Sequence, residues 1–284
     1  MKENKTYPEK TVEIVVKWVM FTAAICGMAL ISAFFPIYAN IPLIVIPSIL
    51  VLIFSKPVFF EKLKLTTLVA MRILVIFAAL RFFNPQVYVD IIMLMLIVNI
   101  LEATFTDLLR HKKIFNAISG FALAVGVVAL RGTWLFETTV GDYYVAKGVL
   151  PIVTLLYVVA YTLWNWIFVT NEFSDSVALM HVGFLGAPII GALCTIWLGP
   201  AGGLGMWLLL RANSLAIGGW MQISAKSWFE REFHSEKFAS FVNWTKKKPV
   251  QITLMIVNVA LIAAAIIITL LNGGISFSFA SFTL

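Results

Sequence analysis

The chain has 284 residues, of which 61% are hydrophobic and only 12% are charged. Soluble globular domains carry about 25% charged residues, so this composition excludes an ordinary soluble fold. The net charge of +7 would suit nucleic-acid binding only on a basic surface domain, and the apolar runs leave no room for one. We therefore expect a single polytopic, all-α integral membrane domain over residues 1–284, without a nucleic-acid partner.

Apolar runs of spanning length, about 17 to 25 residues, follow one another along the chain. The first run is too long for the core of a cleavable signal, so we expect it to stay as a helix. The second run is short and contains Pro42 and Pro47, which predict a kink. The nine expected spans are Val12–Phe34, Ile41–Ser55, Leu65–Phe83, Val87–Leu109, Ile114–Leu130, Val149–Thr170, Val177–Leu198, Gly203–Ser224 and Val250–Leu271.

The distribution of lysine and arginine predicts the orientation, because these residues accumulate on the cytoplasmic side of a membrane. With a cytoplasmic N-terminus and an outer C-terminus, the outer segments hold only Arg81, Arg131 and Lys147. The inner segments then hold Lys2, Lys5, Lys10, Lys56, Lys62, Lys64, Arg110, Lys112, Lys113, Lys226, Arg231, Lys237, Lys246, Lys247 and Lys248. We expect the membrane to be the cytoplasmic membrane of a bacterium.

The longest inner segment lies between the eighth and ninth spans. Phe238, Phe241 and Thr245 follow helical spacing after Ser235, a residue that favours a helix N-cap. Lysines 246–248 come directly after them. This pattern predicts a short helix in the headgroup layer, with anionic lipid of the inner leaflet as its partner. A membrane-anchored connector with no other role is the simpler interpretation.

A weak internal similarity relates the fourth and fifth spans to the sixth and seventh. A shift of 63 residues aligns Gly120 with Gly183 and Glu102 with Asn165. Both pairs of spans would enter and leave the membrane in the same sense, which indicates a parallel repeat of the kind found in several transporter folds. Apolar composition inflates such matches, so an accidental similarity stays open as the alternative.

The stretch Val149–Ile190 places its polar residues on one helical face. Tyr161, Asn165, Phe168 and Glu172 are spaced i, i+4, i+7 and i+11. Hydrocarbon tolerates such a stripe only where it faces other helices or a water-filled cavity. We expect the stripe to line a site.

The fourth span contributes Asn99 and Glu102, with Asp107 nearer the cytoplasm. Arg72 of the third span lies at a depth similar to Glu102, roughly 10 Å from the cytoplasmic helix ends at about 1.5 Å per residue. Because an isolated charge is costly in a membrane, we expect Arg72 and Glu102 to form an ion pair. The pair could be purely structural.

The eighth span carries Arg211 and Asn213, and the seventh carries His181. An arginine near the membrane centre needs an acidic partner or an anionic ligand. The polar residues gather in the cytoplasmic half of the spans, which predicts a cavity open to the cytoplasm. The candidate residues for binding a substrate or ion are Arg72, Asn99, Glu102, Tyr161, Asn165, Glu172, His181, Arg211 and Asn213.

The sequence offers little for a metal or a cofactor. His111, His181 and His234 form no HExxH motif and no His-rich cluster, so we expect no metal site and no cofactor. Cys26 and Cys194 fall within spans, where we expect two buried thiols rather than a disulfide.

Two functional interpretations fit these residues. The first is a small secondary transporter for a polar or anionic solute. The transporter could act as a monomer or as a homo-oligomer. Arg72 or Arg211 would hold the solute, and Glu102 or His181 would exchange a proton. The transporter interpretation is favoured by the possible repeat. It is also favoured because the sequence contains no Walker A, GxSxG or aspartate-rich prenyl-diphosphate signature.

The second interpretation is a membrane-embedded enzyme that acts on a lipid or isoprenoid at the inner leaflet. Its acid–base groups would come from Glu102, Asp107, Glu172, Asp175 and His181. The cytoplasmic placement of the carboxylates favours it. A subunit whose polar stripe packs against another membrane protein is the third alternative.

Overall fold

The computed structural model describes residues 11–55, 57, 59–82, 84–130, 134–140, 143–148 and 150–272. Lys2, Lys5, Lys10, Lys56 and Arg131, which entered the orientation argument, lie outside these residues, as does the end of the chain beyond Asn272.

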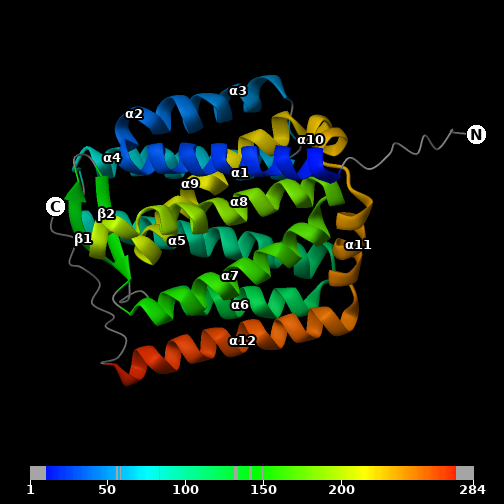
Figure 1. Ribbon diagram of the computed structural model, residues 1–284. Helices are drawn as coiled ribbons and strands as arrows, with labels where there is room; N and C mark the ends of the chain where they lie inside the picture. The colour runs from blue at the N-terminus through cyan, green and yellow to red at the C-terminus, as the bar shows by residue number, and fades with distance from the viewer. Residues whose placement is uncertain are drawn as a thin grey trace, which may run out of the picture.

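Long helices lie side by side in one bundle (Figure 1). In the described part of the chain, six helical segments are long and apolar enough to cross a membrane. They confirm the expected helical membrane fold. The six are α1 (Thr11–Phe34), the segment Pro36–Phe54, residues Val89–Arg110 of α5 (Pro85–Phe105) and η2 (Thr106–Arg110), α7 (Pro151–Glu172), α8 (Asp175–Cys194) and α12 (Lys248–Leu271).

Three further helices run through the same bundle but are shorter or more polar. α6 (Ile114–Ala129) has 16 residues. α4 (Phe59–Ala79) carries Lys64 and Arg72, and α9 (Trp207–Ser224) carries Arg211. With these three, a described helix overlaps each of the nine ranges expected from the sequence, and α4 begins earlier than the sequence indicated.

The second span is longer than expected and is irregular inside. It consists of α2 (Pro36–Asn40), the π-helical turn η1 (Ile41–Val45) and α3 (Ile46–Phe54). The Ile46 N–H bonds the Ile41 carbonyl five residues back. This wide turn directly precedes Pro47, whose ring would crowd a regular α-helical turn.

The two ends of the bundle are covered differently (Figure 1). At one end lie α10 (Lys226–Glu232) and α11 (Glu236–Thr245), and the Ser235 Oγ caps α11 as predicted by accepting from the Phe238 N–H at 3.3 Å. At the other end β1 (Trp134–Val140) and β2 (Tyr143–Gly148) form an antiparallel hairpin that the sequence analysis did not anticipate.

A hydrogen-bonded ion pair holds α10 against α1. Lys17 Nζ donates to Glu232 Oε2 at 2.7 Å, and Arg231 Nε donates to Glu232 Oε1 at 2.9 Å. These bonds from Lys17 and then Arg231 lower the pKa of the Glu232 carboxyl below its usual value. The ionised carboxylate of Glu232 is therefore the form that links α10 to α1.

α7 and α8 are the most enclosed spans. Within each, 61% of the most apolar stretch is buried inside the protein, against 22% for α1 and α12. The face of α7 that carries Tyr161, Asn165 and Phe168 is buried. The polar stripe therefore faces the protein interior, as expected.

Candidate functional site

Arg211 is the most unusual residue of the interior. It lies one turn inside α9 and is only 2% exposed. Its Nε donates to the Tyr161 hydroxyl at 3.2 Å, and one terminal nitrogen donates to the Phe184 carbonyl and the Ser214 hydroxyl, both at 3.4 Å. All three acceptors are neutral. No carboxylate of the described residues forms an ion pair with this guanidinium.

Aromatic side chains surround Tyr161. Its ring lies 5.4 Å from the Arg211 guanidinium carbon, a cation–π distance. The rings of Trp207 and Trp164 lie 5.2 and 5.6 Å from the Tyr161 ring. Both tryptophans are buried, and neither indole N–H has a hydrogen-bond partner among the described residues. The surroundings of Tyr161 therefore hold several donors and few acceptors.

Arg72 takes different partners from the one expected. It donates to the side-chain oxygen of Asn213 and, at 3.5 Å, to that of Asn40. No ion pair joins it to Glu102. Asn213 donates in turn to the Ala29 carbonyl at 3.0 Å, so this buried group joins α4, α9, α2 and α1. The expected Arg72–Glu102 pair is wrong, because α9 lies against the face of α4 that carries Arg72.

Glu102 instead lies beside a hollow between α4 and α5. The hollow has a volume of about 10 Å³, close to what one water molecule needs. Its lining residues are Lys64, Thr67, Leu68 and Met71 of α4 and Met95, Asn99 and Glu102 of α5. The opposite charges of Lys64 and Glu102 attract each other. Lys64 also interacts electrostatically with Arg211 and Glu172.

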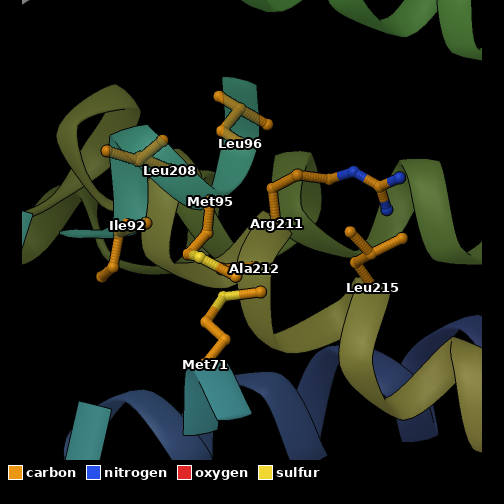
Figure 2. Close-up of a pocket in the computed structure, with 8 residues that line it drawn as sticks. All are labelled: Met71, Ile92, Met95, Leu96, Leu208, Arg211, Ala212 and Leu215. Carbon is orange, nitrogen blue, oxygen red and sulfur yellow. The ribbon is translucent and has the colours of Figure 1, made fainter. Parts of the chain in front are cut away.

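A second hollow of the same size continues from the first, and Met71 and Met95 line both. Figure 2 shows these two methionines facing each other, while the Arg211 guanidinium points away from them. The stem of Arg211 thus lines an apolar space and its charge lies on the far side. The sequence predicted a cavity open to the cytoplasm, but each of these two hollows in the described chain has room for only about one water molecule.

Glu172 belongs to a separate cluster at the α10–α11 end. Its carboxylate lies 3.0 Å from an Arg110 nitrogen and 2.8 Å from His111 Nε2. The other His111 ring nitrogen is 3.3 Å from Asp107, which also accepts from the Asn116 amide at 2.6 Å. The cluster links η2, α6 and α7 at this end of the bundle.

His181 and Asn165 join none of these hydrogen-bonded groups. The His181 ring stacks on Phe173 at 4.8 Å, and its Nδ1 lies 3.2 Å from the Val177 carbonyl. Asn165 is buried on the α7 face. Neither thiol forms a disulfide, and Cys194 is exposed at the end of α8 rather than buried as expected.

The structure therefore divides the nine candidate residues into local groups. Hydrogen bonds join Tyr161 to Arg211 and Arg72 to Asn213, and Asn99 and Glu102 line the same hollow. Sequence reasoning missed Lys64, which it placed in a loop, and His111. The residues Lys64, Thr67, Leu68 and Met71 are spaced i, i+3, i+4 and i+7, so a helical face was already readable there.

No known protein family matches this chain, and neither a curated protein nor a solved structure resembles it.

Proposed function

We propose that the protein is a small secondary carrier for an anionic solute and that Arg211 binds the anion. The supporting observation is the buried Arg211 guanidinium, whose hydrogen-bond acceptors are all neutral. A buried charge without a counter-charge is costly, and a bound anion would offset that cost. The indole N–H groups of Trp164 and Trp207, which have no hydrogen-bond partner in the described chain, add donors near Tyr161.

The carrier would be closed in this conformation. The two best-formed hollows of the described chain have room for about one water molecule each, and the Glu172 cluster links η2 to α7 near the α10–α11 end. A solute would enter after a rearrangement of packed helices, as in alternating access. We propose Glu102 and His181 as the candidates for coupling transport to protons. Basic side chains near α11 are the candidates for contact with anionic lipid.

The binding residue can be tested in proteoliposomes that contain the purified full-length chain. Exchange of radiolabelled phosphate, acetate, citrate and glutamate is measured against protein-free vesicles. We expect exchange of one of these classes, and Arg211→Gln is expected to slow it about a hundredfold, the equivalent of a lost hydrogen bond to a charge. Arg231→Gln, an exposed change on α10, serves as the control.

Equal rates for Arg211→Gln and Arg231→Gln would contradict the role of Arg211. A wild-type protein that exchanges none of the four anions would contradict the proposed carrier. Size-exclusion profiles of the variants show whether the protein is folded in each case.

We also propose that all nine helical segments cross a bacterial cytoplasmic membrane, with the α10–α11 end in the cytoplasm. A cysteine at Asp175, near that end, should react with an impermeant thiol reagent only from the cytoplasmic side. One at Asn272, after α12, should react only from outside. The native Cys194 is first replaced by serine because it is exposed. Reaction of both positions from the same side would disprove the nine-span arrangement.

The enzyme interpretation keeps one specific observation in its favour. Lys64, Asn99 and Glu102 line a hollow in the half of the bundle next to α10 and α11. A carboxylate and an amine at the inner leaflet could act as acid and base on a lipid. Chromatography of a lipid extract incubated with the protein would reveal a converted lipid, and an unchanged extract argues against this function.

A further inference from the structure

The hollow between α4 and α5 lies at the lipid-facing side of the bundle. On α5, Leu94, Val98 and Phe105 are exposed, and Glu102 falls on the same helical face at i+8 from Leu94. On α4, Leu63 next to Lys64 is exposed as well. Lys64, Asn99 and Glu102 themselves are half-buried. The polar groups of the hollow are therefore within reach of a molecule in the surrounding lipid.

In the nine-span arrangement proposed above, the hollow lies near the boundary between the head groups and the hydrocarbon of the inner leaflet. At about 1.5 Å per residue, Glu102 lies about 12 Å from the end of η2, and Lys64 about 8 Å from the start of α4. A phospholipid of this leaflet would bring its head group to that level while its chains lie along the exposed apolar residues.

The hollow has two charges of opposite sign, and neither forms an ion pair with another residue in the described part of the chain. In the described part of the chain, Lys64 and Glu102 form no ion pair with each other, although they interact electrostatically. Neither side chain, nor that of Asn99, makes a hydrogen bond there to another side chain. Half-buried charges that remain apart on two sides of a hollow fit a ligand that carries both charges itself.

We propose that the mouth of this hollow, whose interior has room for about one water molecule, binds the head group of a zwitterionic phospholipid with a primary ammonium group. The phosphate would lie against Lys64, and the ammonium would donate to Glu102 and to the Asn99 side-chain oxygen. A quaternary ammonium has no N–H to donate. An anionic head group would pair with Lys64 but would be repelled by Glu102. The site does not include Arg211, although Glu102 is also a candidate for proton coupling in the proposed carrier. Lipid binding is measured without anion exchange, so a failure of this proposal can be told apart from a failure of the carrier.

Binding is measured on the purified, delipidated full-length chain by native mass spectrometry. The lipids are dioleoyl phosphatidylethanolamine, phosphatidylcholine and phosphatidylglycerol, and soluble phosphoethanolamine tests the head group alone. We expect the ethanolamine lipid to bind at least about tenfold more tightly than the other two, as expected for charge-assisted hydrogen bonds. Lys64→Gln and Glu102→Gln should each abolish this preference, and Lys62→Gln, on the exposed side of α4, should keep it.

Equal affinity for the ethanolamine and choline lipids would overturn the proposal, as would a preference that survives both charge-removing variants. Phosphoethanolamine that binds as tightly as the lipid would assign the site to a soluble zwitterion instead. Asn99→Leu is a third variant, in case either charge removal prevents folding, and it should weaken the preference in the same direction. Anion exchange in proteoliposomes should be unchanged in Lys62→Gln.

Discussion

Replacing Asn213 by leucine is expected to destabilise the protein by about 3 kcal/mol. The substitution removes the side-chain oxygen that accepts from the fully buried Arg72 and the amide that donates to the Ala29 carbonyl. The guanidinium then keeps its charge in the interior with one acceptor fewer. Unfolding in mixed micelles of sodium dodecyl sulfate, followed by tryptophan fluorescence, measures the change in free energy.

A double-mutant cycle separates this interaction from simple packing loss. Arg72→Met removes the charge that needs the acceptor, so Arg72→Met with Asn213→Leu should cost less than the sum of the two single changes. Strict additivity would show that the two side chains do not stabilise each other. The variant pair Arg72→Met and Glu102→Gln is the matched control, and we expect it to be additive.

Replacing Gly202 by alanine is expected to cost about 2–3 kcal/mol and to disturb the site. A Cβ at this position would lie 1.9 Å from the Thr195 carbonyl oxygen, a backbone atom that cannot rotate away. The surrounding turns, η4 (Ile196–Ala201) and η5 (Gly203–Met206), connect α8 to α9. Their displacement would shift the start of α9 and with it Arg211.

Thermal unfolding of the purified variant measures this effect, and Gly27→Ala is the control. Gly27 lies within α1, and a Cβ there would meet no atom within 4 Å. Alanine favours a helix over glycine by about 1 kcal/mol, so the control should be as stable as the wild type or slightly more stable. Similar melting temperatures for the two variants would show that the α8–α9 turn can adapt.

Local patterns predicted much of the fold. Apolar runs located the helices to within a few residues, the spacing of Tyr161, Asn165 and Phe168 indicated a buried face of α7, and Ser235 indicated the start of α11. In each case the information lies within a few turns of one helix. The unexpected π-turn before Pro47 is also a local effect, but proline signals only that some irregularity will occur.

The partners of the buried charges could not be predicted in this way. The sequence predicted similar depths for Arg72 and Glu102, yet a predicted depth does not say which helix lies against which face. Asn213 is 141 residues from Arg72, and only the packing of α9 on α4 brings them together. Lys64 was misplaced because a lysine at the end of a span resembles a loop residue, although its stem can lie along the helix surface.

The long separation between Arg72 and Asn213 also affects how the chain enters the membrane during synthesis. An arginine at the centre of an inserting helix costs about 2.5–3.5 kcal/mol, and α4 is not among the six segments apolar enough to span by themselves. At about 5 to 20 residues per second, the ribosome needs about 7 to 28 s to supply the asparagine. We therefore expect α4 to reach its final position against α9 only after α9 has been synthesised. Until then Asn40 of α2 is a side-chain acceptor for Arg72 that the ribosome has already supplied.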